Sequence, residues 1–192
     1  MRAAPLVPVN RLTDPAAAEI ARAILARSSG VEALDGWTSK VLLAAYGVPV
    51  SRQCLVQSRA AAIEAATEEI GFPCALELGA FRRGGLREPA EIAAAYDEIS
   101  LRPGFAGAWL HEVVADGVSR RIRVSIRQDG ELRLDGNAAG ADPALAGMLA
   151  MVAELAQDLC DAIAAIELDP VILLPDRIVA VGAAIAPRRG NT

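Results

Sequence analysis

The stretch 40–80 limits the possible folds more than any other part of the chain, because helical and strand patterns alternate within it. Its first helix is predicted to end where Gly47 and Pro49 follow the apolar spacing. A strand, an Ala-rich helix capped by Ser58 and a second strand at 74–78 are predicted to follow. The pattern therefore predicts one compact α/β unit.

The rest of the chain adds predicted helices and antiparallel strands. Apolar spacing and alternation predict helices at 15–27, 89–99 and 143–159, a strand at 108–114, and hairpins at 122–134 and 172–181. The first helix has Thr13 or Asp14 as its expected cap, and the first hairpin is expected to turn at Asp129-Gly130. Trp37 is expected in the core rather than stacked on a ligand.

Composition and charge exclude several classes of partner. The 192 residues carry a net charge of -5 and a pI near 5.0, which gives no general attraction to nucleic acid or to an anionic membrane. Three widely spaced cysteines suggest neither a disulfide framework nor a zinc site. No apolar run approaches the ~20 residues of a membrane span, and the first residues make a poor signal peptide. A cytoplasmic location is expected.

Two segments near opposite ends of the chain carry a resemblance to a known family. They are the run AAYGVPV (44–50), with IGFP (70–73) after the Ala-rich helix, and the run AIELDPVILLPDRIVAV (165–181). They resemble the opening and closing segments of the ATP-grasp domain of NDP-forming, or ADP-forming, acyl-CoA synthetases. The resemblance implies an α+β, ATP-grasp-like fold of two small α/β lobes with mostly antiparallel sheets. The expected division is an N-terminal helical arm at 1–38, a first lobe at 39–107, a second lobe at 108–187 and a tail at 188–192.

The same resemblance implies where a nucleotide would bind. AWLHEVVADGV (108–118) is similar to the family's hinge, whose backbone pairs with adenine, and it places Glu112, Val113 and Val114 at that hinge. His111, the only histidine, is expected to have a structural or hydrogen-bonding role rather than a catalytic one.

The predicted strand at 74–78 and the loop that follows it depart from the family pattern. Glu77 aligns with the family's phosphate-binding lysine, and its carboxylate would repel a triphosphate; a surface-facing strand residue is the alternative. The loop that follows, at 79–89, is short and lacks the family's phosphate-relay histidine. Arg82 and Arg83, with the glycines after them, are the candidate anion cradle, and a solvated turn is the alternative.

Glu167 and Asp169 are the best candidates for Mg²⁺ ligands. They match the acidic and Asn positions of the closing motif, and their i, i+2 spacing places them on one face of a strand. Two adjacent carboxylates without a cation would repel each other, and carboxylate oxygen suits Mg²⁺. A purely structural role at the start of the strand is the alternative. The family's acidic residue after the hinge is replaced by Ser119, and most of its segment between Arg127 and Ala141 is missing.

Two functions follow from these features, and a third rests on charge alone. The first is a reduced subunit of an ADP-forming acyl-CoA ligase or related CoA enzyme, which binds ATP or ADP with Mg²⁺ and works with a CoA-binding subunit or as a homo-oligomer. The alternative is a non-catalytic scaffold or regulatory subunit, a pseudoenzyme that keeps the fold without phosphoryl transfer. The third is that arginines of the first hairpin bind CoA phosphates or an anionic metabolite; these are Arg121, Arg123, Arg127 and Arg133.

Overall fold

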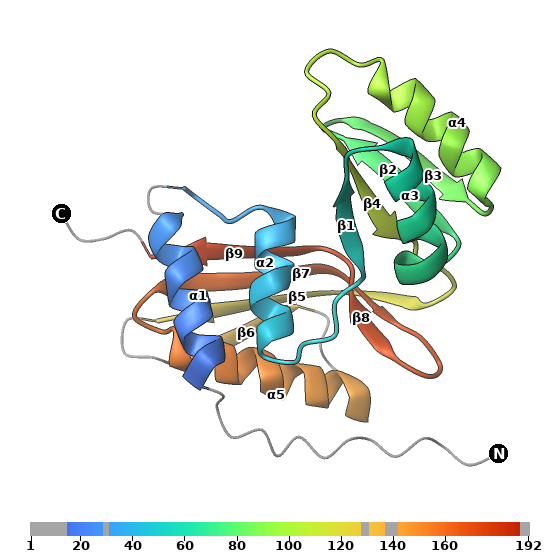
Figure 1. Cartoon of the computed structure of the whole chain (residues 1–192). Coiled ribbons are helices and arrows are strands. Elements are labelled where there is room, and N and C mark those ends of the chain that lie inside the picture. Colours follow the sequence, from blue (N-terminus) through green and yellow to red (C-terminus); the bar gives the residue numbers. More distant parts are fainter. Residues whose placement is uncertain (1–14, 29–30, 128–130, 137–141, 189–192) are drawn as a thin grey trace.

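Two antiparallel sheets form the frame of the molecule (Figure 1). The computed structural model describes residues 15–28, 31–127, 131–136 and 142–188. The smaller sheet has the strand order β1-β4-β2-β3, with β1 Gln53–Val56, β2 Cys74–Leu78, β3 Phe81–Leu86 and β4 Ala108–Glu112. The larger sheet has the order β6-β5-β7-β8, with β9 also paired to β7; its strands are β5 Val118–Ile126, β6 Leu132–Gly136, β7 Ile163–Leu173, β8 Ile178–Ala180 and β9 Ala183–Pro187. The expected α+β fold with mostly antiparallel sheets is confirmed.

Helices cover one face of the smaller sheet and leave the other open toward the larger sheet. These helices are α3 (Arg59–Ala65), which continues as a π-helical turn to Ile70, and α4 (Pro89–Ser100). Ser58 caps α3 as predicted, because its Oγ accepts a hydrogen bond from the Ala61 amide at 3.1 Å. Side chains of α4 at helical spacing, with Ile92 and Ile99 fully buried, fill the core beneath the sheet.

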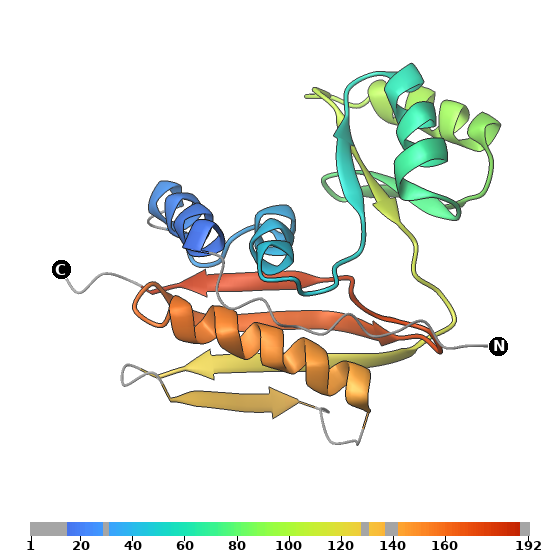
Figure 2. The same ribbon diagram turned by 60° about the horizontal axis from the view of Figure 1, so that its bottom comes forward.

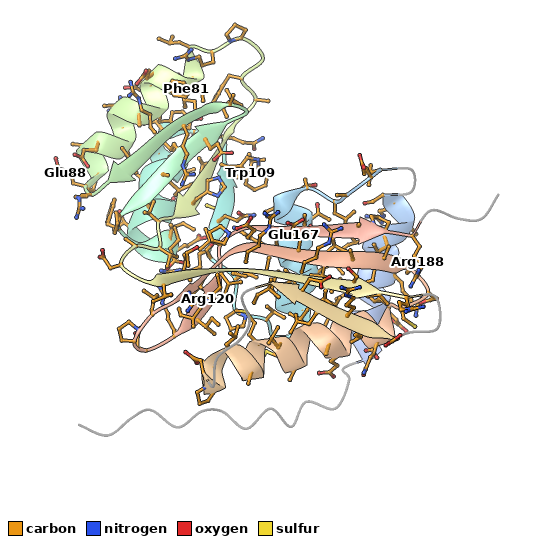
Figure 3. All side chains as sticks on the ribbon, turned by 180° about the vertical axis from the view of Figure 1, so that it is seen from behind. Phe81, Glu88, Trp109, Arg120, Glu167 and Arg188 are labelled. Carbon is orange, nitrogen blue, oxygen red and sulfur yellow. The ribbon has the colours of Figure 1, made fainter. Side chains whose placement is uncertain are left out.

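The larger sheet also has one covered face and one open face. Helices α1 (Pro15–Arg27), α2 (Gly36–Ala45) and α5 (Pro143–Asp158) share a single apolar core with it (Figure 2). The buried residues of β5 are Ile122, Val124 and Ile126, which alternate with arginines as the sequence pattern predicted. Glu167 lies on the opposite, polar face (Figure 3). Among the described helices, none is long and apolar enough to span a membrane.

The prediction that 40–80 forms one compact unit is wrong for its first helix. Leu42 and Leu43 are buried in the core of the larger sheet, whereas the strands that follow in sequence belong to the smaller one. The helix also begins earlier than expected, because Asp35 caps it by accepting a hydrogen bond from the Thr38 amide at 2.9 Å. Because the apolar stripe of α2 points to the larger sheet, Trp37 is 44% exposed rather than in the core.

The segment after β2 was expected to be a loop and forms strand β3 instead. Glu77 pairs with Arg82 and Leu78 pairs with Phe81, directly across a tight turn at Gly79, whose φ is 59°. Backbone pairing with β2 stabilises the strand, so its run of arginines and glycines did not reveal it. Strand β9 was also not predicted.

The expected second lobe begins at a strand that the structure places elsewhere. Strand β4 pairs with β1 and β2, so it lies in the smaller sheet rather than the larger one. The expected division of the chain at residues 38, 107 and 187 stays a prediction. The predicted cap at Thr13 or Asp14, the turn at Asp129-Gly130 and the last residues of the expected tail lie outside the described residues.

Candidate ligand cleft between the two sheets

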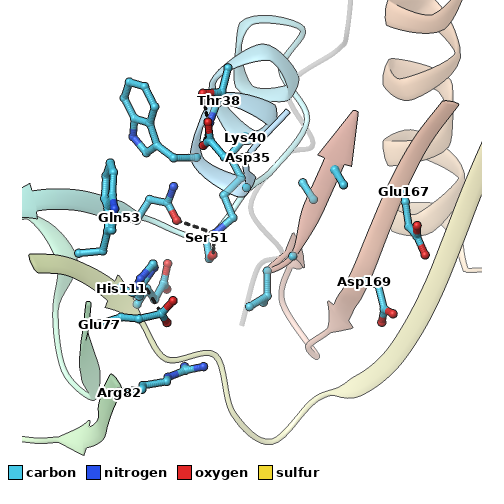
Figure 4. Close-up of a pocket in the computed structure, with 18 residues that line it drawn as sticks. Asp35, Thr38, Lys40, Ser51, Gln53, Glu77, Arg82, His111, Glu167 and Asp169 are labelled. Atoms are coloured by element: carbon cyan, nitrogen blue, oxygen red, sulfur yellow. Dashed lines mark hydrogen bonds and ion pairs between the residues drawn. The ribbon is translucent and has the colours of Figure 1, made fainter. Parts of the chain in front are cut away.

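A cleft of about 810 Å³ separates the open face of the smaller sheet from one end of the larger sheet (Figure 4). Three walls form it. The smaller sheet contributes Gln53, Glu77, Arg82, Trp109, His111 and Glu112; the larger sheet contributes Glu167, Asp169 and residues 181–184; and the start of α2 with the segment after it contributes Asp35–Thr38, Lys40 and Ser51.

Several side chains of types that are rare in this sequence converge on this cleft. Lys40 is the only lysine in the sequence, His111 is the only histidine, and Trp37 and Trp109 are the only tryptophans. They come from separate elements, α2 and β4, that lie in different halves of the fold. Such a concentration of chemically distinct groups marks this cleft as the candidate functional site.

Lys40 forms the polar floor of the cleft. The residue is only 7% exposed, and Nζ donates hydrogen bonds to Ser51 Oγ and Gln53 Oε1, both at 2.9 Å. Burial lowers the pKa of Lys40 to about 8, against the opposing pull of the Glu112 and Glu77 carboxylates. The sequence interpretation missed Lys40, Ser51 and Gln53. The available signal was the pair Ser39-Lys40 next to the apolar run of a buried helix.

Glu77 and His111 face the cleft from neighbouring strands. His111 Nε2 lies 3.7 Å from Glu77 Oε2, too far for a hydrogen bond, and it is buried without a partner among the described residues. Burial lowers the pKa of His111, and the positive charges of Lys40 and Arg82 act in the same direction, while Glu77 opposes them. A neutral imidazole beside a carboxylate therefore occupies the wall where the family resemblance placed a phosphate-binding lysine.

The two arginines of the predicted anion cradle lie on opposite faces of β3. Arg82 lines the cleft, whereas Arg83 binds Glu98 of α4, with Nε 2.7 Å from Oε2. Alternation of side chains along a strand separates them in this way. The structure therefore brings only Arg82 to the candidate site.

Glu167 and Asp169 lie together on β7, facing the cleft, as their spacing predicted. Arg121 of β5 binds both: Nε donates to Glu167 Oε1 at 3.0 Å and lies 3.3 Å from Asp169 Oδ2. This hydrogen bond, with the charge of Arg121, lowers the pKa of Glu167. Among the described residues, no group of three His, Cys, Asp or Glu side chains could hold a metal. Two carboxylates open to solvent still suit Mg²⁺, which takes only one or two carboxylates beside water and phosphate.

The predicted adenine hinge is held by other contacts. The amides of Glu112 and Val113 donate to Arg52 O at 2.9 Å and Pro73 O at 3.1 Å. Val113 and Val114 line a separate depression of about 420 Å³ rather than the cleft. Their role in binding adenine stays a prediction.

The buried carboxylate of Glu112 joins the two halves of the fold. It accepts hydrogen bonds from the Arg52 amide at 3.0 Å and from Arg177 Nη2, in the turn between β7 and β8, at 2.8 Å. Burial alone would raise the pKa of Glu112, but these hydrogen bonds and the Arg52 guanidinium together hold it below its usual value. Glu112 therefore has a structural role between the sheets.

Arginines on the open face of the larger sheet lie next to acidic residues. Besides Arg121, Arg133 lies 3.2 Å from Asp135, and Arg127 lies 3.5 Å from Glu131. Such pairs at an exposed surface compensate charge and leave little excess to attract an anion. The binding of CoA phosphates by this face stays a prediction.

No protein-family model matches the sequence, and no curated protein is significantly similar to it. Among solved structures, the dinucleotide-forming acetyl-coenzyme A synthetase 1 of Ca. Korarchaeum cryptofilum has a TM-score of 0.64 at 21% identity, over 87% of this chain and 98% of that chain. PH1788 from Pyrococcus horikoshii has a TM-score of 0.70 at 22% identity, over 93% and 100%. N5-carboxyaminoimidazole ribonucleotide synthetase from Thermus thermophilus has a TM-score of 0.63 at 18% identity, over 87% of this chain and 51% of that chain.

The chain has an ATP-grasp fold. The resemblance seen in the two end segments is therefore confirmed at the level of the fold. The Korarchaeum synthetase has been solved with coenzyme A together with Ca-AMPCP and, in another crystal, with Mg-AMPPCP and a phosphohistidine segment pointing towards the nucleotide binding site. This ATP-grasp chain spans nearly all of that chain and about half of the ribonucleotide synthetase.

Proposed function

We propose that this ATP-grasp chain is a reduced subunit of an ADP-forming acyl-CoA ligase or related CoA enzyme, and that its cleft binds ATP or ADP with Mg²⁺. The observation that supports the proposal most is the arrangement of charge across the cleft. Arg82 lies on the smaller sheet and Lys40 on the floor, and the carboxylates of Glu167 and Asp169 lie opposite Arg82 on the larger sheet. Phosphates need fixed positive charge, and a divalent cation needs oxygen ligands, so the two walls complement a metal nucleotide.

The charge balance of the cleft makes Mg²⁺ a requirement of this proposal. Five acidic side chains line it, against only two cationic ones; the acids are Asp35, Glu77, Glu112, Glu167 and Asp169. Arg52 and Arg177 offset Glu112, and Arg121 binds Glu167 and Asp169. The cleft therefore has little net positive charge for a free triphosphate, and bound Mg²⁺ would supply it. In this proposal, Glu167 and Asp169 hold the metal after Arg121 moves aside.

CoA and acyl chemistry are assigned to a partner in this proposal. The only histidine of the chain, His111, is half-buried on strand β4 beside Glu77, so this sequence supplies no histidine on a loop for a phosphate relay. A CoA-binding subunit, or a second copy of this chain, would complete the enzyme. As an enzyme, the chain would be a component of an acid–CoA ligase.

One observation favours a second function, that of a non-catalytic scaffold or regulatory subunit. Glu77 lies in the cleft itself, at the position where the family resemblance requires a lysine, and it faces Arg82 across the strand pair. Arg121 binds both carboxylates of the pair without any ligand and offsets one of their two negative charges. The contacts of Arg121 hold the carboxylate pair in place in the absence of nucleotide.

Isothermal titration with ATP and with ADP, each with and without Mg²⁺, tests the proposal. We expect binding tighter than about 100 µM, roughly 5.5 kcal/mol, only when Mg²⁺ is present. The double variant Glu167→Gln/Asp169→Asn should abolish it. The matched control is Glu131→Gln/Asp135→Asn, which removes two other carboxylates next to arginines on the same sheet. Absence of heat with either nucleotide would support the non-catalytic function instead.

A further inference from the structure

The two tryptophans meet across the cleft. Trp37 comes from α2, which packs on the larger sheet, and Trp109 comes from β4 of the smaller sheet. Their ring centroids are 5.7 Å apart at an interplanar angle of 36°. Trp37 is 44% exposed and lines the cleft, so much of its indole surface is open to a ligand. An indole face that is open to the cleft offers a stacking surface to a planar ligand.

The surroundings of the pair suit a flat ring with polar edges. Leu55 is the cross-strand partner of Trp109, so it shares the open face of the smaller sheet, and it is 50% exposed. Gln53 lies on the same face two residues earlier, and its amide oxygen is engaged by Lys40 Nζ. Its amide nitrogen is left as the donor of that side chain. This end of the cleft therefore combines apolar surface with a hydrogen-bond donor.

The hinge predicted from the family offers less to a ring. Two consecutive hinge amides, those of Glu112 and Val113, already donate to backbone carbonyls, and Val113 and Val114 lie outside the cleft. A base bound within the cleft needs another surface to stack on.

We propose that the Trp37–Trp109 pair is the site where the base of a bound nucleotide stacks, at the α2 end of the cleft. This inference rests on the proposed function, because it names the position of the ring of that same ligand. Lys40 follows Trp37 by one helical turn on α2, so the ribose and phosphates would extend from the tryptophans toward Lys40 and the carboxylate pair. Stacking on an aromatic side chain tolerates different bases, so purine nucleotides as a class fit the site.

Intrinsic fluorescence tests the site directly, because no tryptophan lies elsewhere in the chain. The probes are adenosine, Mg-ADP and Mg-tripolyphosphate, which has no ring. We expect adenosine and Mg-ADP to change the tryptophan emission. Trp37→Leu should weaken Mg-ADP binding at least about tenfold, or about 1.4 kcal/mol, without weakening tripolyphosphate binding. Phe81→Leu is the matched control, since Phe81 packs against the core on the helix-covered side of the smaller sheet.

The outcomes separate this inference from the proposed function. Mg-ADP binding that depends on Glu167 and Asp169 but is unchanged in Trp37→Leu and Trp109→Leu would overturn the ring site alone. If adenosine changes the tryptophan emission but Mg²⁺ does not change the affinity for ADP, the result would support the ring site and contradict the metal site. No binding of nucleoside or nucleotide would overturn both. Circular dichroism checks that each variant is folded.

Discussion

At the scale of single residues, Arg121 has the most direct influence on the candidate metal site. Its guanidinium binds both carboxylates of β7, although its own side chain is 66% exposed. Replacing it by glutamine removes a positive charge that competes with Mg²⁺ for the same oxygens. Because the pair is exposed to solvent, the interaction is weak.

We therefore expect Arg121→Gln to raise divalent-cation affinity measurably, because it removes a competing positive charge. This affinity is measured by titration with Mn²⁺, in which the electron paramagnetic resonance signal of free Mn²⁺ falls as the ion binds. Arg133→Gln removes the same charge from the same sheet next to Asp135 and serves as the control. Equal affinities in wild type and Arg121→Gln would contradict the competition.

Lys40 gives a pH dependence whose sign follows from its burial. The folded-state pKa is about 8, below the usual 10.5, so between these values the unfolded chain binds a proton that the folded chain does not. The free energy of unfolding of wild type, relative to Lys40→Met, should therefore rise from about pH 8 to about pH 10 and stay constant below.

Urea unfolding of both proteins at several pH values measures this difference, in which the titration of all other groups cancels. Arg82→Met is the control, because a guanidinium stays charged throughout this range. If the difference in the free energy of unfolding between wild type and Lys40→Met does not change with pH, Lys40 is not desolvated.

At the scale of elements, α5 depends on its first residue. Asp142 Oδ1 accepts hydrogen bonds from the Ala144 and Leu145 amides at 2.9 and 3.3 Å, and the helix buries Met148 and Val152 in the larger core. We expect Asp142→Ala to lower the free energy of unfolding by about 1 kcal/mol. Asp142→Asn should retain nearly all of the stability, because asparagine also caps helices. Chemical denaturation compares the three proteins, and equal losses in both variants would point to charge rather than capping.

Local patterns predicted the elements whose residues alone determine them. Helix α5, helix α4 and strand β2 match the sequence prediction because their apolar spacing is regular and each has a clear start signal. Asp142 caps α5, Pro89 begins α4, and Gly71 and Pro73 precede β2. Strand β3 was missed because its partner, not its own composition, makes it a strand. The packing of α2 was also mispredicted, since an apolar stripe shows that a helix is buried but not against which sheet.

The same distinction applies to the candidate site. The strand period placed Glu167 and Asp169 on one face, and this is observed. The meeting of Lys40 with Gln53, or of Glu112 with an arginine 65 residues later, depends on tertiary structure and has no local signature. Arg121 was assigned to a basic face because its acidic partner lies on another strand.

At the scale of the whole molecule, Glu112 links the two sheets through Arg177. Its side chain is 7% exposed, so its hydrogen bonds to charged groups are strong. We expect Glu112→Gln to lower the free energy of unfolding by about 2 kcal/mol at neutral pH. Because the folded-state pKa of Glu112 is lowered, this advantage of wild type is present above the usual pKa of 4.5 and is lost as pH falls below it.

Guanidinium unfolding at pH 7 and in acid measures the effect of Glu112. The control is Glu98→Gln, which breaks the exposed ion pair with Arg83 within the smaller lobe alone. If Glu112→Gln lowers the free energy of unfolding no more than Glu98→Gln does, the link between the sheets contributes little to stability.

The single lysine on the floor of the cleft also determines where amine-modifying reagents can react with the folded protein. Eighteen of its nineteen strongly basic residues are arginine, since the sequence has nineteen Lys and Arg residues and only one lysine. Acylating or aldehyde reagents therefore find one side-chain amine, which is sheltered between the two lobes and bonded to Ser51 and Gln53. Apart from the amino terminus of the chain, the outer surface presents no primary amine to such reagents. A label that enters at Lys40 would accordingly report on the cleft alone, and a ligand seated there would protect it.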